Sequence, residues 1–452
     1  MSCIARLFSW PTVWLMGNFG GRARYGEDPG GNISKTLGVA VDLTPVLPGG
    51  TNGGLKPAIF SVFGELRKIY PGRFRFVFLS STAGYKEVEE LRGREDLNLC
   101  VVRRGPSTGL KERHVRVKSA IEKIFLLKRL GVKVWYCPFG NIGQAPTGFP
   151  AVALAADLLH RDYPASISEN EREWREIDCQ QLAGRADLIQ VISRFTADQL
   201  HQHYGIDQSK MFLTHLAPIV PVVSVGPVER RTRYFFYPAN FWVHKNHECL
   251  FIAYYQYLRS AGASAWDLYL TGSPGPRMKQ LQQVAASLGL KDRVKFGGYL
   301  RDESFGQMFT NASALVFPSL YEGFGIPLTE AMTLGIPIIA SNSGSIPEVC
   351  GEACHSIDAR KPADISAALL KVASDEAYRK KLIGAAAQRV KNFSLESAAS
   401  RLGEKLIEAA EKKSGWIGYA TRSAATLRGV SLTAKSGIVR RLRTAKKILS
   451  GD

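Results

Sequence analysis

From Leu37 onward, short apolar segments of strand character alternate with longer amphipathic segments of helix character. Strands that are separated by helices pair in parallel, because each helix carries the chain back to the edge where the next strand begins. The alternation therefore predicts an α/β fold with helices on the faces of parallel sheets. At 452 residues the chain is too long for one comfortable core, so we expect two domains.

The apolar segments fall into two series. In the first half of the chain, the expected strands are residues 37–43, 74–80, 97–102, 132–137, 151–158, 188–193 and 211–215. In the second half, they are residues 234–238, 267–271, 294–299, 314–318 and 336–341. A connector rich in Pro and Val, residues 218–227, separates the series and indicates the domain boundary. Two such domains place a cleft between the carboxyl ends of their sheets, where ligands bind in these folds.

Two carboxylates flank a glycine-containing turn in the second half. Residues 321–332 read Tyr-Glu-Gly-Phe-Gly-Ile-Pro-Leu-Thr-Glu-Ala-Met and follow an expected buried strand. Pro327 suits the start of a helix, so Glu322 falls in the loop and Glu330 about one turn inside the helix. Backbone N–H groups between them can hold an anion or a sugar hydroxyl. Taken alone, such a carboxylate can also be an ordinary helix cap or dipole partner.

A glycine-rich segment follows the first expected strand. Residues 47–54 read Leu-Pro-Gly-Gly-Thr-Asn-Gly-Gly and precede an amphipathic helix. Glycines allow the backbone to approach a ligand closely, and the N-terminus of the following helix favours phosphate. The alternative interpretation is an ordinary flexible turn.

These segments resemble the retaining glycosyltransferases of family 4, whose Glu-x7-Glu element matches Glu322 and Glu330. The match continues into residues 334–341, Leu-Gly-Ile-Pro-Ile-Ile-Ala-Ser, and 344–349, Gly-Ser-Ile-Pro-Glu-Val. It covers roughly residues 37–410 and is most specific in the C-terminal half. The resemblance implies the GT-B fold, in which two Rossmann-like doubly wound lobes face a cleft and C-terminal helices brace the first lobe.

On this basis we expect five regions. They are a poorly ordered leader (1–36), an acceptor-side domain (37–220), a nucleotide-sugar-binding domain (221–395), a crossing helix (396–413) and a basic amphipathic tail (414–452). Helix is expected almost without interruption from residue 376 to about residue 413.

The resemblance also implies roles for residues of the second lobe. Lys245 would hold the pyrophosphate of the donor and neutralise the charge that develops on the departing nucleoside diphosphate. Glu322 would contact the donor sugar, Glu330 the ribose hydroxyls, and Tyr299 the base. Position 244 is His rather than the usual Arg, as in members that look like mannosyltransferases or transferases of related deoxyhexoses. The other expected donor-binding residues are Gly49, Gly50, Gly53, Gly54, His244, Asn246, Gly323, Phe324, Gly325, Leu328 and Thr329.

In the first lobe, residues 151–164 resemble the family's strand that ends in His-Asp-x-x-His. Asp157 and His160 match, whereas Ala156 stands where many members have a His beside the reacting sugar. Asp157 would orient the acceptor hydroxyl or act as its base, and it could equally cap a turn. His160 is expected to be an acceptor-site or structural residue rather than a base.

A second segment of the first lobe, residues 192–197, resembles the family's Ser-x-x-(Ser/Thr) turn. Ser193 would cap a helix that runs on through Tyr204. Ser193 and Arg194 are therefore secondary candidates for the acceptor side.

The chain contains no Asp-x-Asp motif, which holds the metal in the other main glycosyltransferase fold. We therefore expect metal-independent catalysis, with no cofactor, in which Lys245 and helix-end N–H groups stabilise the leaving group. The seven cysteines are scattered, and Cys350 and Cys354 have no second ligand pair nearby, so we expect no zinc and reduced thiols in a cytoplasm.

The formal charge of +19 is concentrated near the C-terminus, where residues 412–452 hold ten Lys and Arg against one acid. Basic and apolar residues together suit a helix on an anionic membrane surface, and a solvated basic tail is the alternative. No nucleic-acid recognition motif accompanies the charge. No segment approaches the ~18 apolar residues of a spanning helix, so we expect a cytoplasmic protein that is peripheral to the inner membrane face.

The resulting hypothesis is a retaining glycosyltransferase that moves a hexose from a nucleotide-diphosphate sugar to a glycan or lipid-linked glycan acceptor. GDP-mannose is the first expected donor, and a rhamnose donor is the second. Two alternatives stay open. One is a GT-B nucleotide-sugar epimerase, and the other is a non-catalytic donor-binding protein of a glycan assembly complex, for which Ala156 is the supporting residue.

Overall fold

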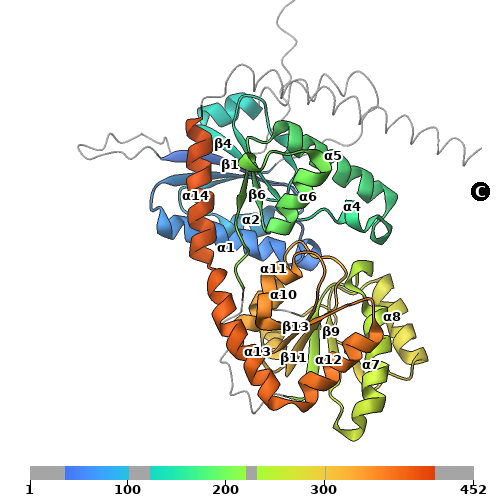
Figure 1. Cartoon of the computed structure of the whole chain (residues 1–452). Helices are drawn as coiled ribbons and strands as arrows, with labels where there is room; N and C mark the ends of the chain where they lie inside the picture. Colours follow the sequence, from blue (N-terminus) through green and yellow to red (C-terminus); the bar gives the residue numbers. More distant parts are fainter. Residues whose placement is uncertain (1–35, 101–122, 220–231, 301, 413–452) are drawn as a thin grey trace, which may run out of the picture.

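The computed structural model describes residues 36–100, 123–219, 232–300 and 302–412. These residues form two α/β lobes, one above the other in Figure 1. The expected tail (414–452), almost all of the expected leader (1–36) and most of the connector (218–227) lie outside the described residues. Within the described ranges, no helix is both long and apolar enough to cross a membrane.

The first lobe is built on a parallel sheet of seven strands in the order β3-β2-β1-β4-β5-β6-β7. Every residue of β1 is buried, as expected of a central strand with helices on both faces. The strand order reverses between β1 and β4, which places a ligand-binding crevice at their carboxyl ends. The strands are β1 (Leu37–Leu43), β2 (Phe74–Ser80), β3 (Leu97–Cys100), β4 (Val132–Cys137), β5 (Ala151–Ala155), β6 (Leu188–Val191) and β7 (Met211–Leu213).

Helices cover both faces of this sheet. The apolar side of α1 places Phe63 edge-on against Phe76 and Phe78, with ring centroids 5.1 and 5.3 Å apart. Such aromatic pairs add to the free energy gained from apolar burial. The helices are α1 (Leu55–Ile69), α2 (Tyr85–Leu91), α4 (Leu159–Asp162), α5 (Glu169–Arg185) and α6 (Arg194–Tyr204), and the short 3-10 turn η1 (Gly49–Asn52) precedes α1.

The second lobe repeats the plan with six parallel strands in the order β10-β9-β8-β11-β12-β13. Its strand order reverses between β8 and β11. The strands are β8 (Tyr234–Pro238), β9 (Asp267–Thr271), β10 (Val294–Phe296), β11 (Ala314–Phe317), β12 (Ile338–Ser341) and β13 (Cys354–Ile357). The helices are α7 (His247–Ala261), α8 (Pro276–Ser287), α9 (Asp302–Thr310), α10 (Ile326–Thr333), α11 (Ile346–Cys350), α12 (Pro362–Ser374) and α13 (Glu376–Arg389).

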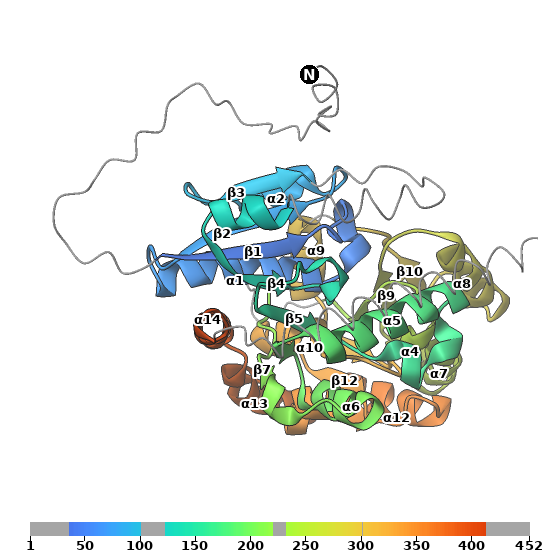
Figure 2. The same ribbon diagram turned by 90° about the horizontal axis from the view of Figure 1, so that it is seen from above.

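The last described helix, α14 (Leu395–Glu411), leaves the second lobe and runs along the first (Figure 1). It packs on α1 and on β4, β5 and β6, and in Figure 2 it is seen end-on beside that lobe. The Tyr70 hydroxyl donates to the carbonyl of Ser400 at 3.2 Å, which joins α14 to the C-terminal end of α1. The expectation of a GT-B fold with a C-terminal helix bracing the first lobe is confirmed.

The expected strands 188–193, 211–215, 294–299, 314–318 and 336–341 are each longer than the observed ones by one to three residues. Three further differences follow. The long helix expected after residue 376 is interrupted at Phe393 and Ser394, because the Ser394 side chain accepts from the N–H of Ser397 and starts a new helix. Strand β5 ends at Ala155 rather than 158, which leaves Asp157 in the loop that packs against Gly323 of the second lobe. Strand β13 was not predicted, since only Ile357 of its four residues is fully buried and the apolar signal is weak.

Candidate active site

The site is built around an ion pair between two loops of the second lobe. Lys245 ends the 3-10 turn η6 (Val243–Lys245) after β8, and Glu322 lies in the loop between β11 and α10. Lys245 Nζ lies 2.5 Å from Glu322 Oε1, and the two side chains are only 10% and 11% exposed. A largely desolvated pair of this kind is costly to break, so it holds both groups in fixed positions.

Hydrogen bonds to the backbone brace this pair. The buried hydroxyl of Tyr237 contacts the carbonyl of Lys245 and the hydroxyl of Ser319, both at 2.9 Å. The N–H of Leu320 donates to the carbonyl of His244 at 2.8 Å. The loop that carries Lys245 and the loop that carries Glu322 are therefore joined by their main chains as well as by the ion pair.

Asn246 performs a similar bracing task. Its backbone has a φ of 62°, which is the only positive φ of a non-glycine residue in the described ranges. Its side-chain amide donates to the carbonyl of Pro318 at 3.1 Å and to that of Ala359 at 2.7 Å. Two features favour Asn at this position. Asn tolerates the left-handed backbone conformation better than most residues, and its amide makes the two bonds to Pro318 and Ala359. A contact from Asn246 to a donor stays a prediction.

The backbone of Glu322 is held by the segment 344–349. The carbonyl of Glu322 accepts from the N–H and the hydroxyl of Ser345, at 3.1 and 3.0 Å. Gly344 has a φ of 61°, and a Cβ added to it would lie 2.7 Å from the Glu322 carbonyl oxygen. Only glycine fits this close approach without moving Glu322.

The first lobe touches the second at Gly323. A Cβ added to Gly323 would lie 2.1 Å from the carbonyl oxygen of Ala156 and 3.0 Å from Cβ of Asp157. The residue after Glu322 therefore packs directly against the loop that follows β5. This contact brings the candidate acceptor-side carboxylate, Asp157, next to the loop of the candidate donor-side carboxylate, Glu322.

A second ion pair lies on the acceptor side of this contact. Arg175, on α5, bonds Asp157 Oδ1 at 3.0 Å and also Glu171 at 3.0 Å. The same Asp157 oxygen accepts from the N–H of Leu159 at 3.0 Å. The expected turn-capping role of Asp157 is thus present together with the ion pair. Sequence analysis missed Arg175 because it lies among many charges of α5 and belongs to no motif.

His244 is neutral, unlike the Arg that is usual at this position. Burial, together with the charges of Lys245 and Arg175, lowers the pKa of His244 to about 3. Burial, and then Lys245, likewise lowers the pKa of His247 to about 3. Lys245 is therefore the cation of this segment. Within the described part of the chain, the buried His244 Nδ1 has no hydrogen-bond partner.

Glu330 is buried on α10 and faces the end of the first lobe. Burial raises the pKa of Glu330 to about 8, while a hydrogen bond from the backbone N–H of Ile219 opposes the rise. The carboxyl is therefore largely protonated at neutral pH and can donate as well as accept a hydrogen bond. Helix α10 begins at Ile326 with Pro327 in its first turn, as expected.

The remaining residues of the Glu-x7-Glu segment close the start of α10. The N–H of Leu328 donates to the carbonyl of Gly325, and the hydroxyl of Thr329 donates to that of Ile326, at 3.0 and 2.9 Å. Phe324 turns its buried side chain to His215 and Phe393, with ring centroids 5.9 and 5.7 Å away.

The glycine-rich turn of the first lobe faces this segment across the lobe boundary. A Cβ added to Gly54, the residue before α1, would lie 3.0 Å from the side chain of Ile326. Gly49 is fixed at the other end of the turn, because its carbonyl accepts from Lys56 and its N–H donates to Glu87. Gly50 and Gly53 lie between these points. The fold therefore brings Gly54, the last of the expected glycines, to the helix that carries Glu330.

The secondary candidates His160, Ser193 and Tyr299 differ in their burial and in their contacts. His160 is buried, with Nε2 2.9 Å from the Tyr204 hydroxyl, and burial lowers its pKa. An acceptor-site role for His160 stays a prediction. Ser193 caps α6, which runs to Tyr204 as expected, by accepting from the N–H of Thr196 at 3.1 Å. Tyr299 lies beyond β10 and is 54% exposed.

In the described residues, no three His, Cys, Asp or Glu side chains group closely enough to hold a metal ion.

Two Rossmann-like parallel sheets and a C-terminal helix that returns to the first lobe define the GT-B architecture. Residues 226–389 match the family described as glycosyl transferases group 1. This match lies in the second lobe, and it agrees with the resemblance of that half of the chain to glycosyltransferases.

Two curated proteins similar to this chain are named as mannosyltransferases. O-antigen chain mannosyltransferase B of Escherichia coli is 28% identical over 261 residues, which are 56% of this chain and 68% of that protein. The MMP alpha-(1->4)-mannosyltransferase of Mycolicibacterium hassiacum is 39% identical over 84 residues, which are 19% of this chain and 20% of that one. The matched segment thus spans only a fifth of the second relative.

Solved structures support the fold. The glycosyltransferase of Rickettsia africae ESF-5 superposes with a TM-score of 0.63 at 15% identity, over 84% of this chain and 100% of that one. A sucrose-phosphate synthase of Thermosynechococcus elongatus gives 0.66 at 17% identity, over 82% of this chain and 98% of that one.

Proposed function

We propose that the chain is a retaining hexosyltransferase that moves mannose from GDP-mannose to a glycan or lipid-linked glycan. The observation that carries the proposal is the Lys245–Glu322 pair, which faces the Asp157–Arg175 pair across the Gly323 contact. The curated relatives named as mannosyltransferases favour mannose as the sugar. A rhamnose donor is the second candidate.

The donor would lie on the second lobe with its diphosphate at Lys245. As the bond between the sugar C1 and the phosphate oxygen breaks, negative charge grows on the leaving diphosphate. Lys245 is fixed before the reaction by Glu322 and needs little reorganisation to stabilise this charge. Glu322 would hold a sugar hydroxyl, and the protonated carboxyl of Glu330 would bond the ribose.

The acceptor would approach from the first lobe. Its hydroxyl oxygen forms the new bond to C1 on the face that the diphosphate leaves, so the configuration at C1 is retained. The hydroxyl proton passes to an oxygen of the leaving phosphate, and no strong protein base is required. Asp157, held by Arg175, would accept a hydrogen bond from the acceptor and orient it.

The location of the acceptor depends on residues outside the described ranges. Residues 412–452 carry ten Lys and Arg against one acid, and they would hold the enzyme on an anionic inner membrane face beside a lipid-linked glycan. Sedimentation with phosphatidylglycerol vesicles tests this step. Deletion after Lys413 should release the protein, and equal binding of both forms would contradict the membrane role.

The first test of the function is thermal unfolding of the purified full chain with GDP-, UDP-, dTDP- and ADP-sugars, each in EDTA and in magnesium. A ligand that binds only the folded state raises the melting temperature by mass action. Stabilisation by GDP-mannose in EDTA supports the proposed donor and a site that needs no metal. Failure of every nucleotide sugar to stabilise the protein, in either condition, contradicts the proposal.

The donor incubated without acceptor separates catalysis from epimerisation. A retaining transferase releases GDP and mannose slowly as water takes the place of the acceptor. A GT-B epimerase would instead produce a new nucleotide sugar, which chromatography of the products resolves.

A further inference from the structure

Glu348, on α11, bonds the first lobe with both carboxylate oxygens. Oε1 accepts from the N–H of Arg194 at 2.8 Å, and Oε2 accepts from the N–H of Phe195 at 3.0 Å. Arg194 and Phe195 begin α6. The first N–H groups of a helix have no partner inside the helix, and a carboxylate there also complements the helix dipole.

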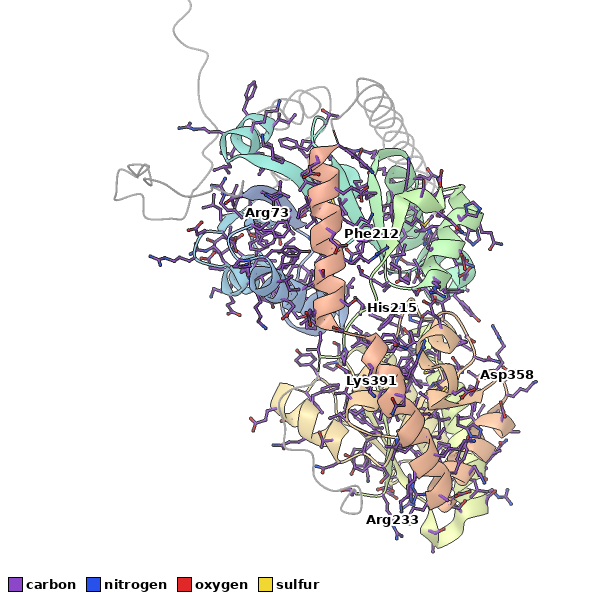
Figure 3. The ribbon with its side chains drawn as sticks, turned by 60° about the vertical axis from the view of Figure 1, so that its left-hand side comes forward. Arg73, Phe212, His215, Arg233, Asp358 and Lys391 are labelled. Atoms are coloured by element: carbon purple, nitrogen blue, oxygen red, sulfur yellow. The ribbon has the colours of Figure 1, made fainter. Side chains whose placement is uncertain are left out.

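A third contact comes from the segment that follows β7. His215 Nε2 lies 3.1 Å from Glu348 Oε1. Figure 3 places His215 at the boundary between the two lobes, where its ring also packs against Phe324 and Phe393. Burial opposes ionisation of Glu348, but the bonds from His215, Arg194 and Phe195 outweigh it and lower the pKa of Glu348. The carboxylate is therefore charged in this contact.

The other end of α11 holds the donor side of the site. Ser345, immediately before α11, donates from its N–H and its hydroxyl to the carbonyl of Glu322. The four residues from Ser345 to Glu348 thus join the backbone of Glu322 to the N-terminus of α6 in the first lobe. Figure 1 shows α11 on the side of the second lobe that faces the first.

We propose that Glu348 is a positioning residue that fixes the two lobes in register, so that Asp157 meets the donor sugar held at Glu322. The catalytic part of this inference rests on the proposed function, whereas the contact between the lobes does not. Glu348 acts through α6 and α11 and touches neither sugar. A small displacement of the acceptor from the reacting carbon is enough to slow transfer, because the rate depends on near-attack geometry.

Hydrogen exchange of the full chain, followed by mass spectrometry, tests the contact directly. In Glu348→Gln the side chain keeps its volume but loses its charge and presents an amide to the N–H donors. Peptides that cover residues 193–197 should exchange at least about fivefold faster than in the unchanged protein. Glu352→Gln, a change at an exposed acid just after α11, is the matched control and should leave this peptide unchanged.

A second variant removes the same bond from the opposite side. Arg194 is the first residue of α6, where proline is tolerated, and Ser193 before it is extended, with φ −151° and ψ 157°. Arg194→Pro deletes one N–H donor while Glu348 stays in place, and it should speed exchange at the N–H of Phe195. Unchanged exchange in both variants would overturn the inference.

Turnover of GDP-mannose tests the positioning role. In Glu348→Gln, kcat should fall about tenfold while the Kd for GDP stays within about twofold, because Lys245 and Glu330, the main expected contacts of the nucleotide, both lie in the second lobe. An unchanged kcat together with faster exchange would overturn the positioning role. If the unchanged protein neither binds GDP nor releases it from GDP-mannose, the proposed function fails, and the exchange result still decides whether Glu348 joins the lobes.

Discussion

The hydroxyl of Tyr321, in the second lobe, accepts a hydrogen bond of 2.8 Å from the backbone N–H of Leu158, in the first lobe. Tyr321 precedes Glu322 in the chain, and Leu158 follows Asp157. The bond therefore lies beside both candidate site carboxylates and keeps the loops that carry them together. Because Leu158 is fully buried, its N–H would have to reach water or stay unpaired without this partner.

Tyr321→Phe should destabilise the closed arrangement of the lobes. The change removes the acceptor oxygen but keeps the ring, which packs on Phe195 and Tyr163 with centroids 5.7 and 6.1 Å away. A buried N–H left without a partner costs about 1–3 kcal/mol, so we expect the free energy of unfolding in urea to fall by about that amount. Tyr299→Phe, at a half-exposed tyrosine, is the control. Equal unfolding curves for Tyr321→Phe and the unchanged protein would contradict the role given to this bond.

Lys245→Met should abolish most of the transfer activity. The substitution keeps the length of the side chain but removes the charge that would stabilise the leaving diphosphate, and it leaves Glu322 without its partner. Loss of one preorganised electrostatic contact typically lowers kcat about 10²–10³-fold. Release of GDP from GDP-mannose measures the effect, with Lys279→Met on the exposed face of α8 as control. Activity within a factor of about three of the unchanged protein would rule out this role for Lys245.

Arg175→Met should affect the acceptor step more than donor binding. Asp157 would lose its 3.0 Å ion pair and its fixed orientation, whereas Lys245 and Glu322 keep theirs. We expect kcat to fall about tenfold, with the melting-temperature rise caused by GDP unchanged. Arg172→Met removes an exposed arginine one turn earlier on α5 and should have no effect. If GDP no longer stabilises Arg175→Met, then Arg175 belongs to the donor site instead.

Glu330 should make the stability of the protein depend on pH. Its pKa is raised from the ordinary value of 4.5 to about 8 in the folded state, so folding favours the protonated carboxyl. Its stabilising contribution is complete below about pH 4.5 and is lost as the pH rises through about 8. Compared with Glu330→Gln, the unchanged protein should lose a few kcal/mol of unfolding free energy between pH 5 and about pH 9. Urea unfolding at several pH values measures the difference, and Glu303→Gln at an exposed position serves as control.

A pH-independent difference between Glu330→Gln and the unchanged protein would mean that Glu330 is ionised in the folded state throughout this range. In that case the ionised carboxylate of Glu330 could accept hydrogen bonds from the ribose hydroxyls but could not donate one.

Local sequence patterns were sufficient for the central strands named below and for the segments that carry the candidate site. The central strands β1, β2, β4, β8 and β9 begin and end at the expected residues, because a parallel strand buried on both faces is a continuous apolar segment. The start of α10 near Pro327 and the cap of α6 at Ser193 follow from local backbone chemistry. The edge strand β13 lacked such a signal because it is largely half-buried or exposed.

The amino-acid sequence by itself determined the two parallel α/β lobes and the pairing of Glu322 with Glu330 around one helix start, since both depend on residues close together in the chain. Only the tertiary structure decided which charged side chains pair with each other and which contact a helix N-terminus. Arg175 reaches Asp157 and Glu348 reaches α6 across separations of 18 and 154 residues. The first pair depends on how α5 lies against the loop after β5, and the second depends on how the two lobes contact each other. Neither arrangement can be read from periodicity or from spacing along the chain.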